Sequence, residues 1–173
     1  YVLVWADESG TGEDLAITEA DLDNLIRTKG AIYAGIATLL ESAKAVVAAR
    51  PKRSVVFVAV TAEEKGLLGS RYYALNPTVP KDGIVANINM DMFLPLFPMK
   101  TLMVLGLDES DLGDDVRAVT TAMSVGVQAD PEPQRNRFIR SDQYSFIREG
   151  VPALAMKVGY DEGTPEAKIA PHL

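Results

Sequence analysis

Apolar runs of strand-like composition alternate along the chain with segments of helical periodicity, and this alternation limits the possible folds more than any other feature. Strands are predicted at residues 1–6, 53–61, 83–93, 100–107, 127–130 and 151–159, and helices at 18–30, 31–50, 65–76, 108–126 and 141–150. Such alternation is typical of an α/β fold in which helices cover a largely parallel or mixed sheet. No linker or internal repeat interrupts the pattern, so residues 1–173 are expected to form a single domain.

The composition is that of a globular protein with an acidic surface. Hydrophobic residues make up 47% of the 173 residues, which is enough for a core, and the net charge is −7. This charge disfavours binding to nucleic acid and to anionic membranes, so neither is an expected partner. No apolar run approaches the roughly 18 residues that span a bilayer. The absence of cysteine excludes disulfides and thiolate metal ligands.

Carboxylates stand where several of the predicted strands end. Glu63 and Glu64 follow the strand at 53–61, Asp91 lies near the end of the strand at 83–93, and Asp7 follows the first strand. Ligands of open α/β sheets bind beyond the carboxyl ends of the strands. Carboxylates that converge there repel one another, and a divalent cation is the usual means of holding them together.

The two adjacent glutamates are expected to do different work. Neighbouring residues of an extended chain point to opposite sides, so one glutamate can bind a metal while the other takes a proton from a water that the metal polarises. A simpler interpretation remains open, in which Glu63 and Glu64 form a solvated turn before a helix whose N-terminus favours acidic residues. Arg135, Arg137 and Arg140 likewise form either a solvated basic loop or a contact for an anionic substrate.

Three segments resemble the signatures of one enzyme family, in the family's order and spacing. They are RSVVFVAVTAEEKGLLGSRYYALNP (53–77), IVANINMDMF (84–93) and SDQYSFIREGVPALAMKVGY (141–160). Together with the helix at 31–50, they make most of residues 31–160 similar to the co-catalytic dizinc exopeptidases of the bacterial leucyl-aminopeptidase and glutamate carboxypeptidase-like type.

The resemblance implies a fold, a reaction and roles for three residues. The fold is a three-layer α/β/α sandwich with a mixed central sheet, and the reaction is zinc-dependent hydrolysis of a peptide bond, which releases an N-terminal residue in most members. Glu63 matches the general base, Glu64 a ligand of one zinc ion, and Asp91 a ligand of the other. The implied cofactor is therefore two zinc ions, and the implied partner is a peptide substrate.

The chain departs from the family at the other metal ligands. The segment YVLVWADESG offers Asp7 where the family has a histidine ligand, and residues 29–37 contain no carboxylate where a bridging aspartate is expected. The only histidine, His172, is either a substitute for the last ligand or a solvated tail residue. Two carboxylates alone hold zinc weakly, because zinc sites use at least three protein ligands.

These departures leave open what the chain does. The alternative to an active exopeptidase is a catalytically inactive peptidase-like domain with a binding or structural role, and a third hypothesis is a hydrolase that uses another metal with Asp7 as a ligand. The strand-like start YVLVW suggests a processed or truncated piece of a longer protein. No export signal is visible, although the resemblance favours an extracytoplasmic or secreted location. Residue preference and oligomeric state cannot be derived from the sequence.

Overall fold

The computed structural model describes residues 3–6, 34–93, 97–161 and 163–168, which belong to two compact units, Tyr1–Val60 and Thr61–Leu173. The helix predicted at 18–30 lies outside the described residues. Among the described residues, no helix is both long and apolar enough to cross a membrane. The expectation that residues 1–173 form one peptidase-like domain stays a prediction.

The first unit pairs two short strands and adds one helix. Strand β1 (Leu3–Ala6) runs antiparallel to β2 (Val55–Val58), and α2 (Ala34–Ala49) lies between them in sequence. Ala43 of α2 and Phe57 of β2 are buried together at the centre of this unit. The helix is therefore confirmed. Strand β2 is shorter than the strand predicted at 53–61, because its pairing with β1 extends over only four residues.

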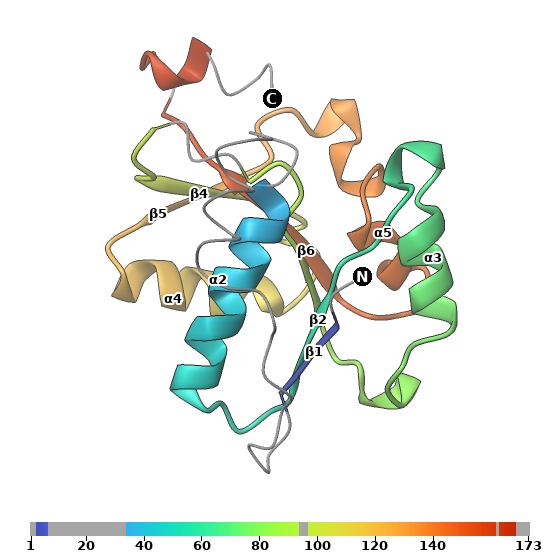
Figure 1. The fold of residues 1–173 in the computed structure, drawn as a ribbon. Helices are drawn as coiled ribbons and strands as arrows, with labels where there is room; N and C mark the ends of the chain where they lie inside the picture. Colours follow the sequence, from blue (N-terminus) through green and yellow to red (C-terminus); the bar gives the residue numbers. More distant parts are fainter. Residues whose placement is uncertain (1–2, 7–33, 94–96, 162, 169–173) are drawn as a thin grey trace. The chain divides into compact units, whose positions relative to one another are not determined.

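The second unit is built on a mixed four-stranded sheet (Figure 1). The order of its strands is β3 (Asn87–Asn89), β6 (Ala153–Val158), β4 (Thr101–Leu105) and β5 (Gly126–Ala129). β3 and β6 are parallel, β6 and β4 antiparallel, and β4 and β5 parallel. The predicted α/β class, the mixed sheet and the edge strand at β5 are confirmed, whereas β3 has only three of the eleven residues expected at 83–93.

Alternation along the two central strands gives the sheet two different faces. Leu102 and Val104 of β4 pack with Leu154 of β6 and with Val116 of helix α4 (Leu112–Ala122). The intervening residues point the other way, because side chains alternate along a strand. On that second face Met103, Leu105 and Ala155 form a separate core cluster, against which Phe138 packs from the loop before α5.

The second unit contains two further helices and five short 3₁₀ turns among its described residues. They are α3 (Leu68–Leu75), α5 (Gln143–Ile147) and the 3₁₀ turns η2 (Glu63–Lys65), η3 (Lys81–Gly83), η4 (Pro133–Arg135), η5 (Arg137–Ile139) and η6 (Glu166–Lys168). Helices α3 and α5 contact each other through a buried hydrogen bond of 2.9 Å between the hydroxyls of Ser70 and Ser145. Asp142 stands at the N-cap of α5, where its side chain forms no capping hydrogen bond.

Candidate functional site

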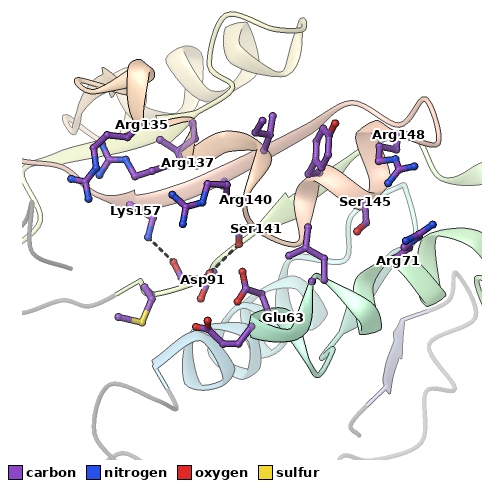
Figure 2. A pocket seen from close by; sticks show the side chains of 18 residues that line it. Glu63, Arg71, Asp91, Arg135, Arg137, Arg140, Ser141, Ser145, Arg148 and Lys157 are labelled. Carbon is purple, nitrogen blue, oxygen red and sulfur yellow. Dashed lines mark hydrogen bonds between the residues drawn. The ribbon is translucent and has the colours of Figure 1, made fainter.

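A cavity of about 710 Å³ opens within the second unit, on the sheet face that the loop 131–142 covers (Figure 2). Glu63, Glu64 and Asp91 all line this cavity. Leu105 of β4 and Ala155 of β6 also line it, and both are buried core residues. The sequence thus predicted correctly that carboxylates from two separate strand ends meet at one place.

The backbone at the two glutamates differs from the expected one. Glu63 and Glu64 lie in the 3₁₀ turn η2, not in extended chain, so the argument that they point to opposite sides of a strand is wrong. The turn begins after Ala62, whose φ of 58° is left-handed. The bond from the Leu67 amide to the Glu63 carbonyl, 2.9 Å long, then closes the turn before α3. Both glutamates reach the cavity because of this turn.

Left-handed backbone recurs beside the segments that line the cavity. Ala62 precedes Glu63, Met92 follows Asp91 with a φ of 54°, and Asn136 has a φ of 51° between two cavity-lining arginines. Residues other than glycine rarely adopt this conformation, and where they do the strain is most often found at functional sites.

A hydrogen bond from Ser141 fixes the Asp91 carboxylate, and Ser141 is itself held by a further bond. The Ser141 hydroxyl donates to Oδ2 of Asp91 at 3.0 Å (Figure 2). The Asn89 amide donates in turn to the Ser141 hydroxyl at 3.1 Å and to Oε1 of Gln143 at 2.8 Å. Gln143, which is fully buried, donates to the carbonyl of Phe138. This chain of bonds ties the end of β3 to the loop and to α5.

The surroundings of Glu63 suit a proton acceptor. Burial raises the pKa of Glu63, and the nearby carboxylates of Asp91 and Glu64 raise it further, while the positive charge of Arg140 opposes the shift. A carboxylate whose pKa lies closer to neutrality is a better general base at neutral pH. Glu63 can therefore take a proton from a water molecule in the cavity.

Positive charge dominates the rest of the cavity wall. Six cationic side chains line it, namely Arg71, Arg135, Arg137, Arg140, Arg148 and Lys157. The Lys157 ammonium donates to the backbone carbonyl of Asp91 at 3.4 Å. Burial lowers the pKa of Lys157, as does Arg137, whereas the charge of Asp91 acts in the opposite direction. The cavity thus combines three carboxylates with twice as many cations.

The donors in the described part of the chain do not make up a zinc site. No three histidine, cysteine, aspartate or glutamate side chains within the described ranges are grouped so that they could hold a metal ion. Glu64 and Asp91 supply two carboxylates, and the hydroxyl of Ser141 already bonds one oxygen of Asp91. Asp7 and His172, the two further ligands suggested by the sequence, lie outside the described residues and stay predictions.

Sequence reasoning missed four of the residues that face the cavity. Ser141 belongs to a recognised signature, but nothing in its spacing indicates a bond to Asp91. Lys157 stands two residues after Ala155, so strand periodicity could have placed both on one face of β6. Arg71 and Arg148 come from two helices whose approach no local pattern reveals. The loop arginines were recognised, and all three line the cavity.

Comparison with known proteins gives one consistent result. Residues 11–170 match the model of peptidase family M28. Among solved structures, an aminopeptidase from Aneurinibacillus sp. strain AM-1 is 24% identical with a TM-score of 0.56, and the alignment covers 74% of this chain and 30% of that one. The zinc aminopeptidase BSAP from Bacillus subtilis is 22% identical with a TM-score of 0.58, and the alignment covers 73% of this chain and 31% of that one. A comparison with curated protein sequences found no match.

A third solved structure agrees with the first two in fold. The LapA aminopeptidase from Legionella pneumophila is 22% identical with a TM-score of 0.55, and the alignment covers 71% of this chain and 33% of that one. At this level of identity the likeness concerns the fold. The chain spans about a third of the length of the solved structures that it matches.

Proposed function

Because the chain belongs to peptidase family M28, we propose that it acts as a zinc-dependent exopeptidase of the aminopeptidase type, with Glu63 as the general base and Glu64 and Asp91 as metal ligands. The observation that carries the proposal is the placement of Glu63 beside Asp91 in a cavity that raises the pKa of Glu63. The substrate is a peptide, and the wider wall of the cavity offers room for it.

The residues of the chain suggest how such a reaction is supported. Glu63 accepts a proton from water, and its partly buried position keeps its proton affinity high enough for that step. The positive charge of Arg140 acts against the rise of the Glu63 pKa. The bond from Ser141 holds the carboxylate of Asp91 in one orientation.

The metal ions need donors beyond the two carboxylates. The solved structure of BSAP is described as that of a zinc aminopeptidase, which favours zinc in the family. Two carboxylates of the described chain fall short of the three ligands that zinc normally needs. We propose that His172 supplies a nitrogen donor, and that Asp7 is a further candidate. Location outside the cytoplasm is likewise part of the proposal.

A second function has its own supporting observation. The described residues lack a complete set of metal ligands, while the cavity has a volume of about 710 Å³ and six cationic side chains in its wall. These features favour a catalytically inactive peptidase-like domain that binds peptides. The two functions differ in whether zinc uptake and hydrolysis occur.

The test combines metal content with hydrolysis of aminoacyl-anilides by the full chain in the presence of zinc. We expect zinc to be bound, turnover to occur, and Glu63→Gln to lower kcat by about 10²- to 10⁴-fold without lowering zinc content. Glu64→Gln and Asp91→Asn should lower zinc content, whereas Glu109→Gln, an exposed carboxylate outside the cavity, should not.

Three results would contradict parts of the proposal. Zinc uptake without turnover by the native chain contradicts the exopeptidase activity, and full turnover in Glu63→Gln contradicts the role of Glu63 as general base. Neither zinc uptake nor turnover, with peptide binding retained, favours the inactive binding domain.

A further inference from the structure

Two arginines, one on α3 and one at the C-terminal end of α5, form a distinct part of the cavity wall. Arg71 follows Ser70 on α3, and Arg148 directly follows α5, three residues after Ser145. Because the hydroxyls of Ser70 and Ser145 are hydrogen-bonded to each other, the backbones that carry the two arginines are held close together. Both side chains are exposed and line the cavity (Figure 2).

The charges of these two arginines are not neutralised within the described part of the chain. Neither Arg71 nor Arg148 forms an ion pair there. The loop arginines differ in this respect, since Arg137 pairs with Asp130 at 2.7 Å and Arg135 pairs with Glu132 at 3.0 Å. Arg71 and Arg148 are therefore available to a ligand.

The remaining cations of the cavity already face protein groups. Lys157 donates to the carbonyl of Asp91, and the charge of Arg140 acts on Glu63. In a chain with a net charge of −7, six of the seventeen basic residues nevertheless line this one cavity. Because these six cations outnumber the three carboxylates of the cavity, its wall carries a net positive charge, which raises the local concentration of anionic ligands.

The guanidinium groups of these two arginines favour a carboxylate as the anionic ligand. The planar guanidinium of arginine offers parallel donors that match the two oxygens of a carboxylate. Leu67 and Tyr144 line the cavity next to these helices and provide apolar surface for the rest of a peptide.

We propose that Arg71 and Arg148 form a subsite that binds a carboxylate of the peptide ligand. The inference rests on the proposed function in that it takes the ligand to be a peptide. The carboxylate belongs either to an acidic side chain or to the free C-terminus of a short peptide, because both present the same group to the arginines.

Isothermal titration of the full chain with four tripeptides tests the subsite. The peptides are Ala-Glu-Ala amide, Ala-Gln-Ala amide, Ala-Ala-Ala with a free carboxylate, and Ala-Ala-Ala amide, all titrated with EDTA present so that metal-dependent hydrolysis does not interfere. We expect a peptide that carries a carboxylate to bind about five- to tenfold more tightly than its neutral counterpart. Higher salt should reduce this preference.

Substitution of the arginines locates the effect. Arg71→Gln and Arg148→Gln should each remove most of the preference for the carboxylate, and both positions are exposed, so the fold should be retained. Arg53→Gln is the matched control, because Arg53 is an exposed arginine just before β2 that does not line the cavity. It removes the same charge and should leave the preference unchanged.

The outcomes separate the subsite from the proposed catalysis. A preference for glutamate alone assigns the subsite to acidic side chains, and a preference for the free carboxylate alone assigns it to the C-terminus. Equal binding of all four peptides, or an equal loss in Arg53→Gln, overturns the subsite even if the chain hydrolyses anilides. A preference that depends on Arg71 and Arg148 supports the subsite even if the chain is inactive.

Discussion

Two single residues around the cavity have features that are uncommon in proteins, a left-handed backbone at a residue other than glycine and a partly buried carboxyl group. Ala62, with its left-handed φ, positions Glu63 and Glu64 in η2, and Asp142 is a carboxyl group that is partly buried beside other carboxylates. Each feature is expected to lower stability where it serves the arrangement of the site. Both expectations can be tested by single substitutions.

Replacing Ala62 with glycine should raise the free energy of unfolding by about 1 kcal/mol, because glycine adopts a φ of 58° without strain. Ala74→Gly is the control. Ala74 is buried in α3, where glycine should instead lower the free energy of unfolding by about 1 kcal/mol. Urea denaturation of the two variants measures both effects, and a loss of stability in Ala62→Gly would contradict the prediction.

Asp142 should make stability depend on pH. Burial raises the pKa of Asp142, and Asp91 adds to the shift, while a hydrogen bond with Ser70 opposes it. The folded chain therefore holds this proton more tightly than the unfolded chain does. The contribution of Asp142 to the free energy of unfolding consequently falls as pH rises from about 4, the unfolded pKa, through the raised folded value.

The variant Asp142→Asn cannot titrate at this position. Relative to the native chain, it should become more stable as pH is raised from about 4 to 7. Chemical denaturation of both proteins at several pH values gives the comparison. A stability difference that is independent of pH would show that Asp142 titrates alike in the folded and unfolded chains.

At the scale of elements, the two faces of the sheet divide stability from function. The face toward α4 is a continuous apolar core, and the other face is the floor of the cavity.

Leu154 of β6 belongs to the apolar core toward α4 and is 1% exposed. We expect Leu154→Ala to lower the free energy of unfolding by about 2–5 kcal/mol. Val119→Ala, at an exposed position of α4, should change it by less than about 0.5 kcal/mol, and thermal denaturation measures both.

Gln143 connects elements that the sequence presents as separate. Its amide accepts a bond from Asn89 and donates one to the carbonyl of Phe138, all without exposure to solvent. Gln143→Leu should lower the free energy of unfolding by about 2–4 kcal/mol, because two polar groups lose their buried partners. In this variant, amide exchange should also become faster than in the native chain, and more so in the loop 131–142 than in β5. An equal increase in both regions would contradict a local role of Gln143.

The sequence predicted those parts of the fold that local patterns determine. Hydrophobic periodicity identified the strands and helices that lie within the described residues, and the position of Glu63, Glu64 and Asp91 near strand ends followed from the α/β pattern. The length of β3 could not be predicted, because it is set by pairing with β6, a strand far away in sequence, which pairs with only three residues of β3. The approach of Arg71, Arg148 and Lys157 depends on how α3, α5 and β6 pack, which no neighbouring residue encodes.

For the molecule as a whole, charge is distributed unevenly. The chain carries 24 acidic and 17 basic residues, and the cations of the cavity are an exception on an acidic protein. We therefore expect no measurable binding to double-stranded DNA at about 0.15 M salt, because extended phosphate backbones need a broad basic surface. Fluorescence anisotropy with a labelled duplex tests this, and micromolar binding would show that the cavity cations act as a general polyanion site.

The cavity floor and the core share residues, and this has a consequence for how the chain can diverge. Leu105 and Ala155 belong to a buried cluster and also line the cavity, so mutations that reshape the floor reduce stability at the same time. Substitutions at the rim of the cavity, which is the part formed by Arg71 and Arg148, should not lower stability in this way, because both side chains are exposed. New ligand preferences should accordingly evolve through charge changes at the rim, and laboratory libraries that vary these two positions should contain far more folded variants than libraries that vary the floor.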